Sequence, residues 1–159
     1  MLYADNQFKW VAVLNRKAPL PTLLNALGHL AVGMQALPLS EEAKQFHNYG
    51  GADGNPFAAI SHWPVIVLQG NNSNQLRTLR SAAAASGLAC QTFVDTMLGS
   101  SAADQIEKTK TTDDEKIEYI AVMLFGPAEA LQALTRKFSL FSPPAADTYG
   151  RGFHTLDPH

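Results

Sequence analysis

The sequence has few charged residues and a single cysteine. Asp, Glu, Lys and Arg make up 16% of the 159 residues, whereas 46% are hydrophobic, and the net charge is −2. This composition is typical of a folded globular chain. The near-neutral balance offers no basic surface, so we expect no strong nucleic-acid binding. Because Cys90 stands alone, the chain can form no intramolecular disulfide and no thiolate cage for a metal.

Long hydrophobic runs and complete functional motifs are also absent. No segment has the apolar length that crosses a bilayer, and the start MLYADNQFKW lacks the regions of a signal peptide. We therefore expect a cytoplasmic protein without a membrane partner. No histidine pair has a helical metal-ligand spacing, and NYGGADGNPF lacks the lysine that ends a phosphate loop. We expect neither a metal nor a cofactor.

The stretch of residues 8–34 predicts a strand followed by a helix. The almost continuous apolar run 8–14 is typical of a central strand covered on both faces. Pro19 and Pro21 then fix backbone angles at which a helix can start. Residues at a spacing of three and four predict its buried stripe: Leu20, Leu23, Leu24, Leu27, Leu30, Ala31 and Met34. The residues off this stripe are Thr22, Asn25, Ala26 and His29.

The remaining segments complete an α/β pattern. Residues 37–60 are polar and glycine-rich: SEEAKQFH (40–47) favours a short helix capped by Ser40, and NYGGADGNPF (48–57) is expected to be loop. Strands are expected over residues 64–69, 89–94 and 117–125, the last of them central. Helices are expected over residues 71–88 and after Pro127, and residues 98–116 are expected to be a polar, mobile excursion. Arg77 and Arg80 lie off their helix's apolar stripe, where they either meet a phosphate or form a solvated face. We expect a three-layer α/β/α fold with a mixed, mainly parallel four-stranded sheet. It forms a single domain over residues 1–142, followed by a tail, 143–159.

Several short signals follow one another in the order of a known fold. They are LPTLLNALGHLAVG, HWPVIVLQ, AAAASGL, QTFVDTMLGSS, YIAVMLFGP and LTRKFSLF. In this order the chain resembles the type II peptidyl-tRNA hydrolase fold and, more specifically, the uncharacterised DUF2000 family. The resemblance covers roughly residues 8–141 and implies a peptidyl-tRNA hydrolase II-like domain.

The resemblance carries over only part of the hydrolase site. His29 falls on the family histidine and Asp95 on the family aspartate. Thr22 stands where the hydrolases have their catalytic lysine, and Ala26 stands where they have a glutamine. Gly99 falls on the family threonine, and Ser100 and Ser101 are candidate replacements for it. Because the site differs, the hydrolase activity does not follow from the fold.

Two interpretations of His29 and Asp95 stay open. His29 is either a proton-shuttling group at the mouth of the sheet or a helix histidine with a structural partner. Asp95 is either a site carboxylate or a turn cap at a strand end. In the functional interpretation, we expect His29, Asn25 and Asp95 to converge on one pocket at the carboxyl end of the first strand.

The sequence favours a binding module for a small ligand or a protein. The alternative is an ester or amide hydrolase that works through Asp95, His29 and Asn25. Thr22 cannot supply the cation that stabilises an oxyanion, so Arg16 or Lys17 would have to reach Asp95 instead. We also expect a homodimer, because small domains often pair through an apolar strand edge or helix. The candidate ligand-binding residues are Thr22, Asn25, Arg16, Lys17 and Ser100.

Overall fold

A computed structural model describes residues 7–99 and 101–143 of the chain. Its strands and helices are β1 (Phe8–Asn15), α1 (Leu20–Gly33), β2 (Phe46–Gly50), β3 (Pro56–Ser61), β4 (Val65–Gly70), α2 (Ser73–Ala85), β5 (Ala89–Val94), α3 (Ala102–Thr111), β6 (Tyr119–Pro127), α4 (Ala128–Thr135) and β7 (Ser139–Leu140). Short 3-10 turns are η1 (Met34–Ala36), η2 (Glu41–Lys44), η3 (Asp95–Met97) and η4 (Asp114–Lys116). No helix in these residues is long and apolar enough to span a bilayer.

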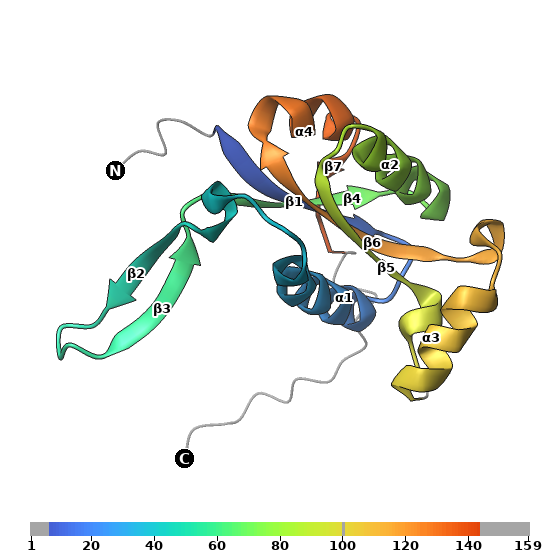
Figure 1. Ribbon diagram of the computed structural model, residues 1–159, viewed down its shortest axis with the longest axis horizontal. Helices are drawn as coiled ribbons and strands as arrows, with labels where there is room; N and C mark the ends of the chain where they lie inside the picture. The colour runs from blue at the N-terminus through green and yellow to red at the C-terminus, as the bar shows by residue number, and fades with distance from the viewer. Residues whose placement is uncertain (1–6, 100, 144–159) are drawn as a thin grey trace, which may run out of the picture.

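Five of the strands form one mixed sheet in the order β5-β6-β1-β4-β7. The mixed α/β class is therefore confirmed. The expectation of four mainly parallel strands was wrong, because only β1 and β4 pair in parallel. In Figure 1, α3 lies beyond the end of the sheet and does not cross its face, so the chain turns back and β6 runs antiparallel to β5.

Helices cover both faces of the sheet (Figure 1). Along β1, Trp10, Ala12 and Leu14 belong to the hydrophobic cluster under α1. The alternate residues Val11 and Val13 belong to the cluster under α2 and α4. Every residue of β6 except Pro127 is buried. This two-sided burial confirms the central positions predicted for the apolar runs 8–14 and 117–125.

The buried stripe of α1 differs in part from the predicted one. Leu23, Ala26, Leu30 and the following Met34 face the core, whereas Leu24 is 58% exposed. The expectation that Ala26 lies off the stripe was wrong. The helix packs on the sheet through a narrow line of residues, and the small Ala26 lets its backbone approach the strands closely.

The predicted boundaries of α2 are confirmed by its caps. The Asn72 side chain accepts a hydrogen bond from the backbone N–H of Gln75, at 3.0 Å. At the other end, Gly87 has φ +65°, and the Leu88 N–H donates to the Ala83 carbonyl at 3.0 Å. This glycine-terminated motif ends the helix and turns the chain into β5.

The glycine-rich stretch is a β-hairpin, so the expectation that residues 48–57 form only loop was wrong, whereas the short helix expected after Ser40 is present as the 3-10 turn η2. Strands β2 and β3 pair antiparallel as a separate two-stranded sheet, and Figure 1 shows the hairpin projecting from the body of the protein. The Gly51 N–H donates to the Asn55 carbonyl at 2.7 Å, and Gly54 adopts φ +82°. The polar, glycine-rich residues thus form only the tip of the hairpin.

Residues 98–116 also contain structure that the sequence interpretation lacked. The Ser101 hydroxyl accepts a hydrogen bond from the Asp104 N–H at 3.2 Å and starts α3. Thr109 of this helix hydrogen-bonds to the buried Thr96 at 2.6 Å. No residue of α3 is buried, which explains why its sequence shows no apolar stripe. The predicted tail lies outside the described residues from position 144 onwards.

Candidate functional site

The side chains predicted on α1 lie at the surface. His29 is exposed and stacks on Phe93 of β5, with ring centroids 6.0 Å apart. Asn25 is exposed and Thr22 is half-buried. Within residues 7–99 and 101–143, no hydrogen bond is formed by the side chains of these α1 residues. The helix therefore brings His29 beside β5 but leaves its polar atoms facing solvent.

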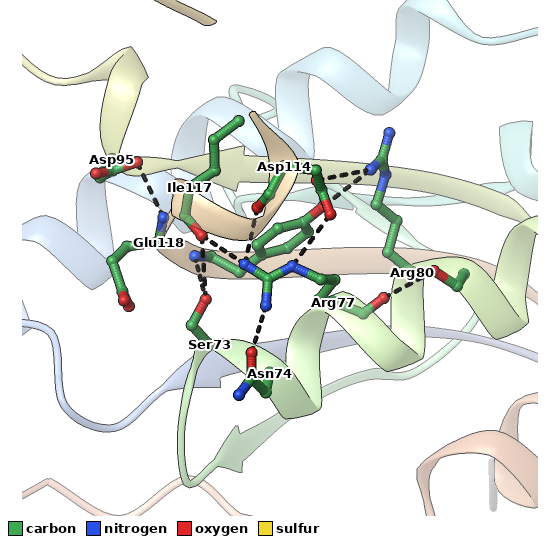
Figure 2. A network of polar contacts seen from close by, with 10 residues as sticks. Ser73, Asn74, Arg77, Arg80, Asp95, Asp114, Ile117 and Glu118 are labelled. Atoms are coloured by element: carbon green, nitrogen blue, oxygen red, sulfur yellow. Dashed lines mark hydrogen bonds and ion pairs between the residues drawn. The ribbon is translucent and has the colours of Figure 1, made fainter. Parts of the chain in front are cut away.

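Asp95 is the first residue of η3 and directly follows the last residue of β5. Its Oδ1 accepts a hydrogen bond from the Glu118 N–H at 3.1 Å, and its own N–H donates to the Glu118 carbonyl at 3.0 Å (Figure 2). In the sheet, β6 lies between β5 and β1. The catalytic role of Asp95 stays a prediction, as does that of His29.

The cations that were candidates to assist Asp95 do not pair with it. Arg16 donates to the Asn71 side chain at 3.4 Å. Among the described residues, neither Arg16 nor Lys17 forms an ion pair with Asp95. Ser100 lies outside the described residues. The arrangement that would have favoured the hydrolase is therefore not formed by these side chains.

A polar network instead joins α2 to the segment before β6 (Figure 2). Arg77 donates through Nη2 to the carbonyls of Ile117 and Asp114, at 2.8 and 2.9 Å, and its Nε lies 3.1 Å from the Asp114 carboxylate. The Ser73 hydroxyl accepts from the Tyr119 N–H at 2.8 Å. Charge-assisted bonds of this kind hold groups in fixed positions. The network fixes the entry of β6 and the orientation of Asp114.

Tyr119 and Arg80 present the outer part of this network. The Tyr119 hydroxyl donates to Asp114 Oδ1 at 2.5 Å and accepts from Arg80 Nη1 at 2.9 Å. Burial, and next the hydrogen bond to Asp114, raise the pKa of Tyr119, so the phenol stays protonated at neutral pH. In the described part of the chain Arg80 uses only Nη1 for these contacts. Its side chain is 54% exposed, and the rest of the guanidinium remains available.

A cleft of about 700 Å³ opens beside these groups. Its volume lies within the range of ligand pockets. Arg80, Asp114 and Tyr119 are among its polar lining residues. Apolar side chains supply much of the rest of the lining: Leu37, Ala84, Leu88, Val94, Met97 and Ile117.

The cleft lies along the outer edge of β5. This strand is the last in the sheet order, so its far side pairs with no other strand of the described chain. Gln91 reaches the α1 side, where it donates to the Gly33 carbonyl at 2.9 Å, whereas Cys90 and Val94 belong to the cluster under α2. Residues from both faces of the strand line the same cleft. Only a cavity at the strand edge can meet both faces.

A second cleft, of about 520 Å³, continues along the start of β5. The two share Leu37, Leu88 and Cys90, so together they follow most of the strand. Burial raises the pKa of the Cys90 thiol, which keeps it protonated and unreactive at neutral pH. Cys90 therefore serves as a small apolar wall residue.

A family model described as "Protein of unknown function (DUF2000)" matches residues 8–142. The chain belongs to the DUF2000 family. No curated protein matches the chain. Among solved structures, a protein of unknown function from Agrobacterium tumefaciens is similar with a TM-score of 0.72 and 14% identity. The similarity covers 86% of this chain and 98% of that one, and at this identity it shows the fold alone. All residues that line the two clefts fall within the DUF2000 match.

Sequence reasoning missed the cleft, although it noticed some of its residues. Arg77 and Arg80 are three residues apart on α2, a spacing that places both on one face of the helix and can be recognised from the sequence. Asp114 and Tyr119, their partners, lie 37 and 39 positions further on. Nothing in local spacing reveals that such distant residues meet.

Proposed function

We propose that this DUF2000 protein is a protein-binding module that takes an extended segment of its partner along the free edge of β5. The observation that carries the proposal is the open edge of β5 inside a cleft lined by both faces of the strand. An extended peptide at such an edge forms main-chain hydrogen bonds, and its alternate side chains enter the flanking pockets. The cleft also supports a small ligand, which is the other binding role we expected.

The lining indicates the kind of segment that fits. Leu88, Met97 and Ile117 offer apolar contacts to alternate side chains of the peptide. Arg80 has unused donors and can pair with an acidic side chain or a carboxylate. The Asp114 carboxylate already pairs with Arg77 at 3.1 Å and with Arg80 Nη1 at 3.6 Å, and it accepts a hydrogen bond from the Tyr119 hydroxyl. We therefore expect a segment with alternating apolar residues and one acidic group.

Selection from a phage-displayed peptide library on the full chain tests this function. We expect enrichment of apolar peptides with an acidic residue, and slower deuterium exchange of β5 amides when such a peptide binds. Ala84→Trp, which places a bulky ring in the cleft, should abolish binding. Ala85→Trp is the matched control, because Ala85 is exposed on the same helix but does not line the cleft.

Charge reversal gives a second, independent test. Arg80→Glu should weaken an acidic peptide at least roughly tenfold, by replacing attraction with repulsion. Arg16→Glu removes another exposed cation outside the cleft and should leave the affinity unchanged. Failure to select any peptide, or binding that is insensitive to both Ala84→Trp and Arg80→Glu, would contradict the proposal.

The type II peptidyl-tRNA hydrolase-like fold and the hydrolase alternative remain proposals from the sequence. We expect no useful hydrolysis of peptidyl-tRNA, because Thr22 and Ala26 replace the family's lysine and glutamine, and Ala26 is fully buried. The check is a turnover assay with peptidyl-tRNA and with simple esters. Turnover that disappears in Asp95→Ala would establish the hydrolase.

A further inference from the structure

The β2–β3 hairpin carries large apolar side chains on both faces. Cross-strand partners share a face, so the register of Phe46 with Ser61 and of Tyr49 with Ala58 places Phe46 and Phe57 on one side and Tyr49 and Ile60 on the other. These four residues are 51, 83, 52 and 48% exposed, respectively. A lone hairpin exposed in this way is unusual, because apolar residues on a two-stranded ribbon normally face a core.

The rest of the described chain does not cover this surface. No residue from 46 to 60 belongs to either hydrophobic cluster of the described core. In Figure 1 the hairpin extends away from the sheet and from α1. Its root is fixed by a 2.8 Å contact between His47 Nε2 and His62 Nδ1, and the neighbouring Trp63 is buried. The hairpin is thus held firmly at its base while both faces stay open.

The charge of the hairpin indicates what covers it. Between residues 46 and 61 the single charged residue is Asp53, at the tip, and its carboxylate accepts hydrogen bonds from Asn55 at 2.8 and 3.0 Å. Exposed strands usually carry lysine or other charges that prevent pairing with a second strand, and these strands carry none. In a two-fold symmetric dimer, the same surface of each copy contacts the other. An uncharged apolar surface can therefore pack against the identical surface of a second copy without charge repulsion.

The size of the surface agrees with this occupant. Aromatic side chains bury about 150–250 Å² each, so the exposed parts of Phe46, Tyr49, Phe57 and Ile60 amount to roughly 400 Å² per copy. The backbone and the small residues Ala58 and Ala59, also exposed, extend this area. A standard stable interface buries about 800 Å² per partner, so a contact through the hairpin is smaller than standard and fits a dimer that dissociates on dilution.

We propose that the protein forms a homodimer in which the β2–β3 hairpins of two copies pack on each other through these apolar residues. This interface is separate from the β5 cleft, since no residue of the hairpin lines either cleft. The dimer therefore leaves both clefts free, and either proposal can fail without the other.

Sedimentation and light scattering on the full chain test the dimer. We expect a mass of twice 17.2 kDa, 34.4 kDa, at concentrations of about 100 μM, and dissociation on dilution. Phe57→Asp brings carboxylates together across the axis and should weaken the dimer at least roughly a hundredfold. Val32→Asp is the matched control, because Val32 is 75% exposed on α1, and it should leave the mass unchanged.

A charge-exchange experiment identifies the occupant as a second copy. Phe57→Asp and Phe57→Lys chains should each be monomeric, and an equal mixture should form a heterodimer, since opposite charges then meet across the interface. Circular dichroism checks that each variant is folded. A wild-type chain that is monomeric at all concentrations would overturn the proposal. A dimer that survives Phe57→Asp but dissociates in Val32→Asp would place the interface elsewhere and overturn it equally.

Discussion

The Arg77–Asp114 network and the outer face of α1 both present polar groups beside β5, but they hold them differently. In the network, Arg77 bonds two backbone carbonyls and a carboxylate, and Tyr119 is fixed by donor and acceptor contacts. On α1, Asn25 and His29 form no side-chain hydrogen bond within the described chain. Sites that bind or react need groups held in place by their neighbours. This difference favours the network over α1 as the part of the protein that binds beside β5. The following substitutions test this comparison.

Removal of Arg77 should have the largest effect. Arg77→Ala leaves the carbonyls of Ile117 and Asp114 without their charged donor, and each such bond contributes roughly 1.5–3 kcal/mol. We expect the free energy of unfolding to fall by about 3 kcal/mol, measured from urea denaturation. Asn25→Ala is the control on α1 and should change stability by less than about 0.5 kcal/mol. Equal losses in the two variants would remove the contrast between the regions.

Loss of the Tyr119 hydroxyl should have a smaller effect. Tyr119→Phe keeps the ring under Arg77, whose guanidinium lies 4.9 Å from the ring centroid, but removes the bonds to Asp114 and Arg80. We expect a loss of about 1 kcal/mol in urea denaturation at neutral pH. The raised pKa of the folded-state phenol means that ionisation opposes folding, so wild-type stability should decline as pH rises above the ordinary value of 10.0. In Tyr119→Phe this part of the alkaline decline should be absent.

The reactivity of Cys90 probes the wall of the cleft. Burial raises its pKa, so little thiolate exists at neutral pH, and iodoacetamide should alkylate the folded chain more slowly than the urea-unfolded chain. The rate should rise with pH beyond the ordinary thiol value of 9.0. A peptide bound along β5 should slow the reaction further, because Cys90 lines both clefts. Rapid alkylation at neutral pH would show that the strand edge is more open than described.

His29→Ala should have the smallest effect. The ring is exposed and stacks on Phe93, so its removal costs one aromatic contact, about 0.5 kcal/mol or less at the surface. We expect peptide affinity and thermal midpoint to match the wild type. A loss of affinity comparable to that of Arg80→Glu would instead place α1 in the binding site.

The sequence predicts those parts of the fold that depend on local pattern. The strand Ala89–Val94 matches its predicted range, and α2 lies within its predicted range 71–88, because apolar runs, Asn72 and Gly87 act on their immediate neighbours. The β2–β3 hairpin was missed because its strands are short and its tip is rich in glycine and asparagine, so the turn residues outweighed the five strand residues on one side and the six on the other.

Strand order and the cleft depend on contacts that local pattern does not contain. The insertion of β6 between β5 and β1 follows from where α3 lies, and α3 has no apolar stripe to reveal itself. The cleft likewise combines α2, β5 and η4. Residues of the cleft could be identified individually in the sequence, but only the folded sheet brings them together.

The central place of β1 has a consequence for the synthesis of the chain. Trp10 pairs with Val65 on one side and with Phe125 on the other, so β1 leaves the ribosome well before the second of its two neighbours is made. At about 5–20 residues per second, β6 follows β1 by on the order of ten seconds. During that time the apolar residues 10–14, all buried in the finished protein, have an incomplete sheet around them. During synthesis, β1 therefore needs protection from aggregation until β6 is in place.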